Sequence, residues 1–549
     1  MYSDRRERLT GDQLTTTSDS QAAPAGDSRL IREFTLWQPG WLKRQPRWAR
    51  LAALLLLLVA ASLYIRTRYI GGQFWMDEGI TVGISSHPLT AIPGILRYDG
   101  SPPLFYLLLH VWMTMVGNGE AATHWLALIF STLTIPVGYW VGSSIDGRRA
   151  GLVSATFFAF NAFLDYYGVE TRMYTMMTLW GLLATAGFIR GFVFRERRYV
   201  LLFAVSEALM LYTHDWSVYF GAGSFLALVL LYFTGDEQIR ENLIKDVVAA
   251  FAGAILLFVP WVPTAIYQAL HTGAPWDKVP RFGAPVQIAV GVFGGASITV
   301  VMLLAAGIGY APMFNRPHKL SRSARVAMML LAIPVLTLLC AWVGSHITPA
   351  WVVRYFAPIV GPLVLLLAIG VARAGVVGAV AVVFVVAFMA RPASFMPQYK
   401  SDMQDVAGEM APMLHPGDLV IVGQPEQTPL AYYYLPGGLR WANTIGPVKD
   451  PSYMNWVDAM KRYKAENPDK VLPPLLNALK PGTQVLYIRP LTEGESNWDA
   501  PWTIMVRRRS AQYGAIIAAD KQLVPETWAP HNYRGACCVA DSAVLYKKL

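Results

Sequence analysis

Long apolar runs separated by polar segments extend from about residue 51 to residue 391 of the chain. Because a helix needs about 20 apolar residues to cross a bilayer, these runs predict about 11 transmembrane helices, a few of them short. The predicted spans are residues 51–64, 125–143, 150–164, 174–193, 199–213, 217–233, 247–263, 293–311, 326–344, 357–373 and 375–391. The pattern therefore predicts a polytopic α-helical membrane protein.

The basic residues of the loops divide unevenly between the two sides of this predicted bundle. With the N-terminus in the cytoplasm, the inner side carries most arginines and lysines, as the positive-inside rule requires. These inner segments are residues 147–149, 195–198, 240–245 and 316–325. We therefore predict a cytoplasmic segment at residues 1–50 and a transmembrane domain at residues 51–391. Because the number of spans is odd, residues 392–549 form a soluble domain outside the cytoplasm.

One apolar stretch does not fit this count. Leu104–Val116 is short for a span, and treating it as one places the basic residues 195–198 outside. We expect a helix that lies on or dips into the outer face. The first outer loop then runs from residue 66 to residue 124, and long ordered loops tend to be functional.

The last 150 residues are polar and rich in proline. Strand-like runs occur at residues 418–423 and 484–488, and helical patterns occur at residues 402–414 and 456–463. We expect an α/β domain, which is large enough to hold its own core. Cys537 and Cys538 are adjacent and rarely bridge each other, so a free pair and a partner cysteine elsewhere both stay open.

Composition agrees with a membrane protein. Of the 549 residues, 54% are hydrophobic and 15% are charged, against about 25% charged in soluble domains. The mean hydropathy is +0.36. The net charge of +10 follows from bases on the cytoplasmic side, so it does not indicate a nucleic-acid partner. The partners expected from this pattern include membrane lipids.

Two adjacent acids, Asp77 and Glu78, follow the first predicted helix. They suit a helix N-terminus, where acidic side chains interact favourably with the positive end of the helix dipole. A carboxylate at the outer leaflet is also suited to act as a general base on an alcohol. Consecutive helical side chains point about 100° apart, so one acid can face a site while the other holds a neighbour.

Further ionisable residues lie at the predicted outer ends of later spans: Glu170, Arg172, Tyr174, His214 and Arg354. Charged groups near the hydrocarbon usually face a cavity or a partner. Arginine suits phosphate, but a salt bridge between Glu170 and Arg172 explains that pair equally well. The position of Arg354 is explained equally well if its side chain snorkels to the lipid headgroups. The position of His214 is explained by a hydrogen-bonded pair with Asp215.

Several motifs are absent from the sequence. It contains no Gly-x-x-x-x-Gly-Lys-Ser/Thr, no Gly-x-Gly-x-x-Gly, no Cys-x-x-Cys and no His-Glu-x-x-His. ATP-driven transport is therefore unsupported. An enzyme that works on the outer face needs a donor already carried across the membrane.

Five short motifs follow one another along the chain. They are the acidic pair, Ser101-Pro-Pro-Leu-Phe-Tyr106, Gly117-x-Gly-Glu120, Gly147-Arg-Arg-Ala-Gly151 and Tyr167-Gly-Val-Glu-Thr-Arg-Met-Tyr174. Together these five motifs resemble those of the GT-C membrane glycosyltransferases. The similarity is to the bacterial family 39-like branch, which is related to protein O-mannosyltransferases and the lipid A aminoarabinose transferase. It is best over residues 70–195.

The resemblance implies an inverting transfer of a sugar from a polyprenyl-phosphate donor to an acceptor hydroxyl. The acceptor is a lipid, a glycan or a protein, and the reaction takes place on the outer face of a bacterial cytoplasmic membrane. Asp77 matches the essential acid that is usually taken as the base, with Glu78 beside it. Candidate donor-phosphate and substrate-binding residues are Arg172, Arg354, Glu170, His214, Tyr174 and Arg97.

The sequence departs from the relatives at one position. They often carry lysine before Pro-Pro, whereas this chain has Ser101, so Arg172, Arg354 or Arg97 has to supply the charge. Some relatives bind a metal near the site and others do not, so a divalent metal stays open. The alternative functions are a transporter or flippase, which predicts ionisable residues along the middle of the spans, and a non-catalytic scaffold.

Overall fold

The computed structural model describes residues 46–313, 320–390, 400–492, 498–529 and 540–549. Most of the predicted cytoplasmic segment, the boundary at residue 391, and Cys537 and Cys538 lie outside the described residues. The chain divides into two compact units, Met1–Leu56 and Leu57–Leu549. The contacts given below lie within the second unit.

In the described part of the chain, eight helices are long and apolar enough to cross a membrane. They form around α3 (Arg47–Arg66), α7 (Glu120–Ala159), α9 (Tyr174–Phe188), α11 (Ser217–Thr234), α13 (Leu243–Phe258), α16 (Ala296–Tyr310), α17 (Arg322–Ile347) and α18 (Ala357–Arg373). Other predicted spans fall on the shorter α10 (Arg198–Leu211) and α19 (Gly375–Met389). The prediction of a polytopic helical protein is confirmed, while the number eleven stays a prediction.

Two of the predicted spans, residues 125–143 and 150–164, are joined in α7. The helix is interrupted at Asp146 and Gly147, where Gly147 adopts a φ of +82°, a conformation that glycine reaches without steric cost. Arg373 at the end of α18 donates from Nε to Asp146 Oδ2 at 2.7 Å. Arg148 and Arg149 therefore directly follow the interruption of the helix. The helix ends at Ala159, and α8 (Ala162–Tyr167) begins after it.

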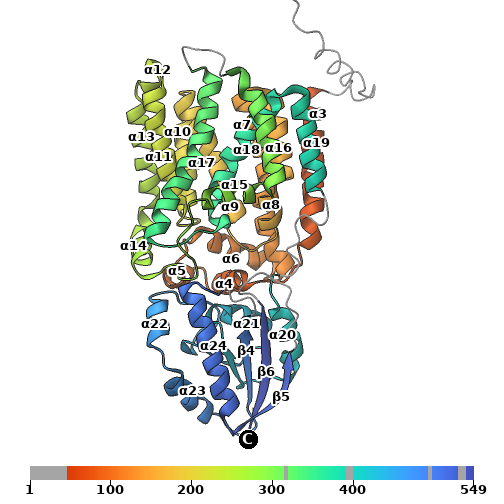
Figure 1. Ribbon diagram of the computed structural model, residues 1–549, viewed down its shortest axis with the longest axis vertical. Helices are drawn as coiled ribbons and strands as arrows, with labels where there is room; N and C mark the ends of the chain where they lie inside the picture. The colour runs from red at the N-terminus through yellow and green to blue at the C-terminus, as the bar shows by residue number, and fades with distance from the viewer. Residues whose placement is uncertain (1–45, 314–319, 391–399, 493–497, 530–539) are drawn as a thin grey trace, which may run out of the picture. The chain divides into compact units, whose positions relative to one another are not determined.

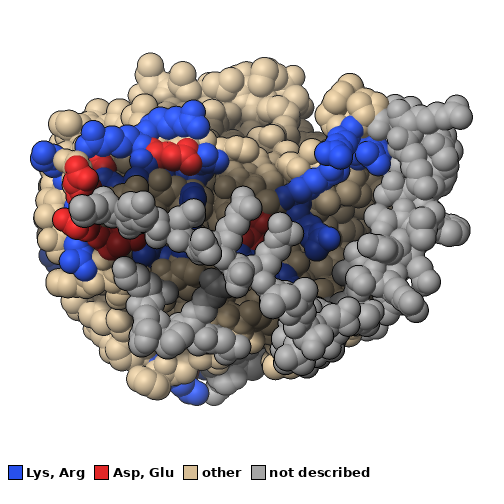
Figure 2. Space-filling view, turned by 90° about the horizontal axis from the view of Figure 1, so that it is seen from above, with Lys and Arg blue, Asp and Glu red and all other residues tan. Residues whose placement is uncertain are grey.

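Ion pairs link the predicted inner loops to one another. Arg195 Nη2 lies 2.8 Å from Asp246 Oδ2, and Arg325 Nη2 lies 3.1 Å from Asp236 Oδ2. The end of the bundle that carries α12 (Glu237–Arg240) is at the top of Figure 1, and Figure 2 views the molecule from above that end. The view shows Lys and Arg side chains mixed with Asp and Glu side chains on this face. These loops therefore meet at one end of the helices.

The C-terminal residues form a mixed six-stranded sheet with the order β3-β2-β1-β4-β6-β5 (Figure 1). Its strands are β1 (Leu419–Val422), β2 (Arg440–Asn443), β3 (Gly446–Val448), β4 (Gln484–Pro490), β5 (Leu523–Ala529) and β6 (Asp541–Lys548). The strands expected at residues 418–423 and 484–488 are thus confirmed as β1 and β4. Both are buried, as hydrophobic strand runs in a parallel arrangement require.

Helices cover both faces of this sheet. Alternate residues of a strand point to opposite faces, so Val420 and Val422 share one core with α20 (Met403–Met410) and α21 (Thr428–Tyr434). Leu419 and Ile421 share the other core with α23 (Pro468–Asn477) and α24 (Pro501–Ala519).

The predicted first outer loop is ordered and helical. It contains α4 (Met76–Ser85), α5 (Ile92–Asp99) and α6 (Leu104–Val116), the last with the predicted bounds. α4 packs on α21, where a Cβ added to Gly79 lies only 2.7 Å from Leu430 Cα. A glycine at this point therefore permits the close approach of the two helices. Phe74 and Val82 of this loop thus belong to the same hydrophobic core as side chains between Met403 and Leu545.

Candidate active site

Asp77 lies in the first turn of α4, which begins after the extended residue Trp75. Its Oδ2 lies 3.3 Å from Arg354 Nη2, and the two side chains remain 21% and 20% exposed. The two residues are 277 positions apart in the sequence. The structure therefore brings the predicted acid and a predicted phosphate-binding arginine together at a site open to solvent.

Arg354 is held by aromatic residues as well as by Asp77. Its Nε donates to the Tyr174 hydroxyl at 3.0 Å, and its Cζ lies 5.1 Å from the Trp75 ring centroid. A guanidinium on an aromatic face gains cation–π attraction. Snorkelling to lipid is therefore not the arrangement observed.

Arg172 contacts the same helix one turn further along. Its Nη1 donates to Thr81 Oγ1 at 2.6 Å and lies 3.4 Å from both the Asp77 carbonyl oxygen and the Tyr106 hydroxyl. Its Nε is buried and has no hydrogen-bond partner within the described residues. A buried N–H without a partner costs free energy, so this donor is suited to an anion bound beside Asp77.

Glu170 does not pair with Arg172 in the described structure. Its Oε1 instead accepts a hydrogen bond from Trp75 Nε1 at 3.2 Å. Burial and the nearby charge of Glu78 raise the pKa of Glu170 to about 7, although Lys400 and Arg354 oppose them. The side chains of Glu170 and Arg172 thus bond to different residues in the described structure.

Glu78 faces away from Asp77 into a fully buried network. His124 Nε2 lies 2.7 Å from its Oε1, and the backbone N–H of Thr171 donates to the same oxygen at 2.7 Å. Lys400 donates from Nζ to Oε1 at 3.0 Å and to Oε2 at 2.8 Å. Burial alone raises the pKa of Glu78, but Lys400 and His124 outweigh it and lower the pKa to about 2.

His214 lies at the edge of the cluster. Its ring centroid is 4.8 Å from that of Tyr355, and its Nδ1 accepts from the backbone N–H of Trp216 at 3.1 Å rather than bonding to Asp215. Burial and the charges of Arg172 and Arg354 lower the pKa of His214 to about 3. The imidazole is therefore neutral, and the predicted hydrogen-bonded pair with Asp215 is not formed.

Arg97 lies apart from these residues. It is on α5, its side chain is exposed, and its Cζ lies 4.0 Å from the Tyr267 ring centroid. Among the candidates from the sequence, Asp77, Arg172, Tyr174 and Arg354 are connected by contacts within one cluster.

The sequence did not identify Lys400, His124, Thr81 or Tyr106 as site residues, although Tyr106 lies in one of the motifs. A lysine just after the last predicted span normally lies in water, so no local pattern marks Lys400. Thr81 is one helical turn after Asp77 on the same helix, and this i, i+4 spacing was the available signal.

The described residues hold no group of three or more His, Cys, Asp or Glu side chains arranged to bind a metal ion. Glu78 and His124 form only a pair, and the ammonium group of Lys400 lies against both. This pair therefore lacks the ligand set of a metal centre.

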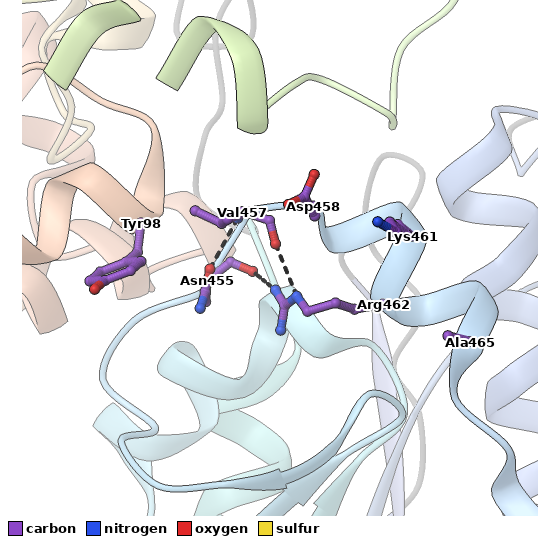
Figure 3. A pocket seen from close by; sticks show the side chains of 7 residues that line it. All are labelled: Tyr98, Asn455, Val457, Asp458, Lys461, Arg462 and Ala465. Atoms are coloured by element: carbon purple, nitrogen blue, oxygen red, sulfur yellow. Dashed lines mark hydrogen bonds between the residues drawn. The ribbon is translucent and has the colours of Figure 1, made fainter. Parts of the chain in front are cut away.

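A separate pocket of about 350 Å³ lies between α5 and α22 (Ala459–Ala465). Figure 3 shows Tyr98 on one side and Asp458 and Lys461 on the other. Arg462 Nε donates to the Val457 carbonyl at 2.9 Å, so part of its hydrogen-bonding capacity is used internally. The pocket contains none of the candidate site residues.

The pH dependence of stability offers a direct test of the Glu170 environment. Its folded pKa is raised above the ordinary 4.5, so the folded state holds more protons and loses stability as pH rises from about 4.5 to 7. Glu170→Gln removes this titration. We expect the unfolding temperature of Glu170→Gln to rise relative to that of the wild type as the pH increases across this range. The measurement is thermal unfolding in detergent at pH 4.5–8, and parallel curves for the two proteins contradict the prediction.

The helical bundle and its packed loop have the GT-C fold, and its eight long apolar helices are suited to cross a membrane. The chain is similar in structure to ArnT from Cupriavidus metallidurans in the apo state, with a TM-score of 0.61 and 14% identity. That match covers 90% of this chain and 98% of ArnT.

A second structure of ArnT, bound to undecaprenyl phosphate, gives a TM-score of 0.58 at 12% identity, over 91% of this chain and 98% of ArnT. No family model matches the sequence, and no curated protein sequence is similar to it. The structural likeness therefore establishes the fold alone.

Proposed function

We propose that this protein is a membrane glycosyltransferase that moves a sugar from a polyprenyl-phosphate donor to an acceptor hydroxyl. The observation that carries this proposal is the open contact of Asp77 with Arg354, beside the unpartnered Nε of Arg172. One base and two cations are the groups that such a single displacement needs. The undecaprenyl phosphate bound by ArnT supports a polyprenyl-phosphate donor here by analogy of fold.

Asp77 is the proposed general base. It is partly exposed, whereas the carboxylate of Glu78 is fully buried and accepts hydrogen bonds on both oxygens. Asp77 takes the proton of the acceptor hydroxyl while that oxygen bonds to the anomeric carbon. The bond from the anomeric carbon to the phosphate oxygen breaks at the same time, which inverts the configuration.

The leaving polyprenyl phosphate retains the electron pair of the broken bond. Arg354 and Arg172 are positioned to stabilise its charge, because guanidinium groups bind phosphate oxygens well. Donor phosphate replaces Asp77 as the partner of Arg354, which frees the carboxylate for the acceptor. Tyr174 orients Arg354 through its hydroxyl, while Glu170 and His214 line the edge of the site.

The proposed topology has about 11 spans, a cytoplasmic N-terminus and residues 392–549 on the outer face of a bacterial cytoplasmic membrane. The ion pairs among the predicted inner loops support it. The contacts of Asp77 and Lys400 involve predicted outer segments only, as this topology requires.

A transporter has one observation in its favour. Glu207 on α10 is buried, and its two carboxylate oxygens have no hydrogen-bond partner among the described residues. A translocation path needs a series of such groups through the membrane. An isolated acid does not supply one, so the enzyme explains more of the observed geometry.

The test uses purified protein in liposomes with a panel of radiolabelled polyprenyl-phosphate sugars and a mixed lipid, glycan and protein acceptor extract. We expect one donor to release polyprenyl phosphate and to label an acceptor. Movement of label across the bilayer without release of polyprenyl phosphate contradicts the proposal and supports a transporter.

A further inference from the structure

Lys400 stands at the start of the C-terminal part of the chain, yet its ammonium group lies inside the first outer loop. It is 8% exposed, and its Nζ reaches Glu78, His124 Nε2 at 3.3 Å and the Val169 carbonyl at 2.8 Å. Lysine and glutamate are seldom buried together unless they are paired. This contact spans 322 positions of sequence.

Glu78 joins several segments at the base of α4. It binds Lys400, the ring of His124 on α7 and the backbone of Thr171, and its Oε2 accepts from the Trp75 N–H at 3.3 Å. A neighbouring face of α4 packs on the C-terminal part, where Gly79 meets Leu430. The helix that carries Asp77 is therefore held at two adjacent positions, Glu78 and Gly79, by residues beyond position 399.

We infer that Lys400 is a positioning residue, and that the C-terminal part of the chain sets the orientation of Asp77 through it. Lys400 keeps Glu78 ionised, and ionised Glu78 fixes the first turn of α4. Without the ammonium group, Glu78 loses the nearest positive charge that offsets its burial and keeps only the hydrogen bonds to His124 and the backbone. The turn then loses its anchor while the rest of the domain keeps its core.

The inference rests on the proposed function only for its catalytic consequence. Displacing a catalytic group by about 1 Å can cost about 100-fold in rate. We therefore expect Lys400→Met to lower kcat for donor turnover by about 100-fold, while the KM for the donor, whose phosphate contacts Arg354, changes little. Lys470→Met, on the exposed surface of α23, is the matched control and leaves both values unchanged.

A second measurement does not depend on any substrate. Hydrogen–deuterium exchange of the full chain in nanodiscs reports the local opening of α4. We expect peptides covering residues 75–86 to exchange about tenfold faster in Lys400→Met, while peptides from β1 and β4 stay unchanged. The same peptides in Lys470→Met should match the wild type.

A double-mutant cycle separates positioning through Glu78 from a general structural role. If Lys400 acts through Glu78, Glu78→Gln combined with Lys400→Met opens α4 no more than Lys400→Met alone. The inference is overturned if the two substitutions increase the exchange rate of α4 independently, so that their effects multiply. It is also overturned if the exchange of α4 in Lys400→Met is unchanged. If the wild type turns over no donor, the proposed function fails, while the exchange data still decide the role of Lys400.

Discussion

Asp77→Asn abolishes sugar transfer, with kcat falling by about 10³-fold or more, because the amide cannot accept the proton of the acceptor hydroxyl. The substitution keeps the size of the side chain, and an amide oxygen still accepts from Arg354. Donor binding should therefore change by no more than about threefold, which places the loss in the chemical step. The measurement is steady-state release of polyprenyl phosphate at saturating donor.

Two controls make the Asp77 result specific. Glu409→Gln alters an exposed acid on α20 and should retain wild-type activity. Glu78→Gln should open α4 in hydrogen exchange, whereas Asp77→Asn should leave that exchange unchanged. If Asp77→Asn transfers sugar at more than about one-tenth of the wild-type rate, Asp77 is not the base.

Replacing Arg354 has the second largest effect. Arg354→Met removes the cation beside Asp77 and the donor to the Tyr174 hydroxyl, so stabilisation of the leaving phosphate is lost. Loss of one preorganised donor typically costs about 10²–10³-fold in kcat. Arg354→Lys should recover part of this rate, because an ammonium group keeps the charge but not the two-pronged geometry.

Arg97→Met is the matched control for Arg354. Arg97 is also an arginine of the predicted outer segments, but it lies on Tyr267, outside the cluster. We expect less than a threefold change in kcat or KM. Equal losses in the two variants indicate a general electrostatic effect on donor approach, and they contradict a specific role for Arg354.

The sequence predicted local features well because their signals are local. Hydropathy marks helices that must bury their backbone polar groups within the bilayer, and Leu104–Val116 was placed as a helix with its observed bounds. The adjacency of Asp77 and Glu78 on a helix was enough to predict that they face different ways, as observed. The break between the spans at residues 125–143 and 150–164 was predicted where α7 is interrupted at Gly147, because the hydropathy pattern marks where an apolar run is broken. The two halves of α7 pack beside each other, with Gly142 against Ser154.

The tertiary structure alone decided which distant residues meet. Sequence chemistry treated Arg97, Arg172 and Arg354 as equal candidates, since each is an arginine near the outer face, and only packing separates Arg97 from the other two. Lys400 carried no signal, because a lysine after a span normally lies in water, and its burial depends on a carboxylate 322 positions away. Periodicity encodes which face of a helix is buried, whereas the identity of the partner on that face depends on how the helices and the C-terminal sheet pack together.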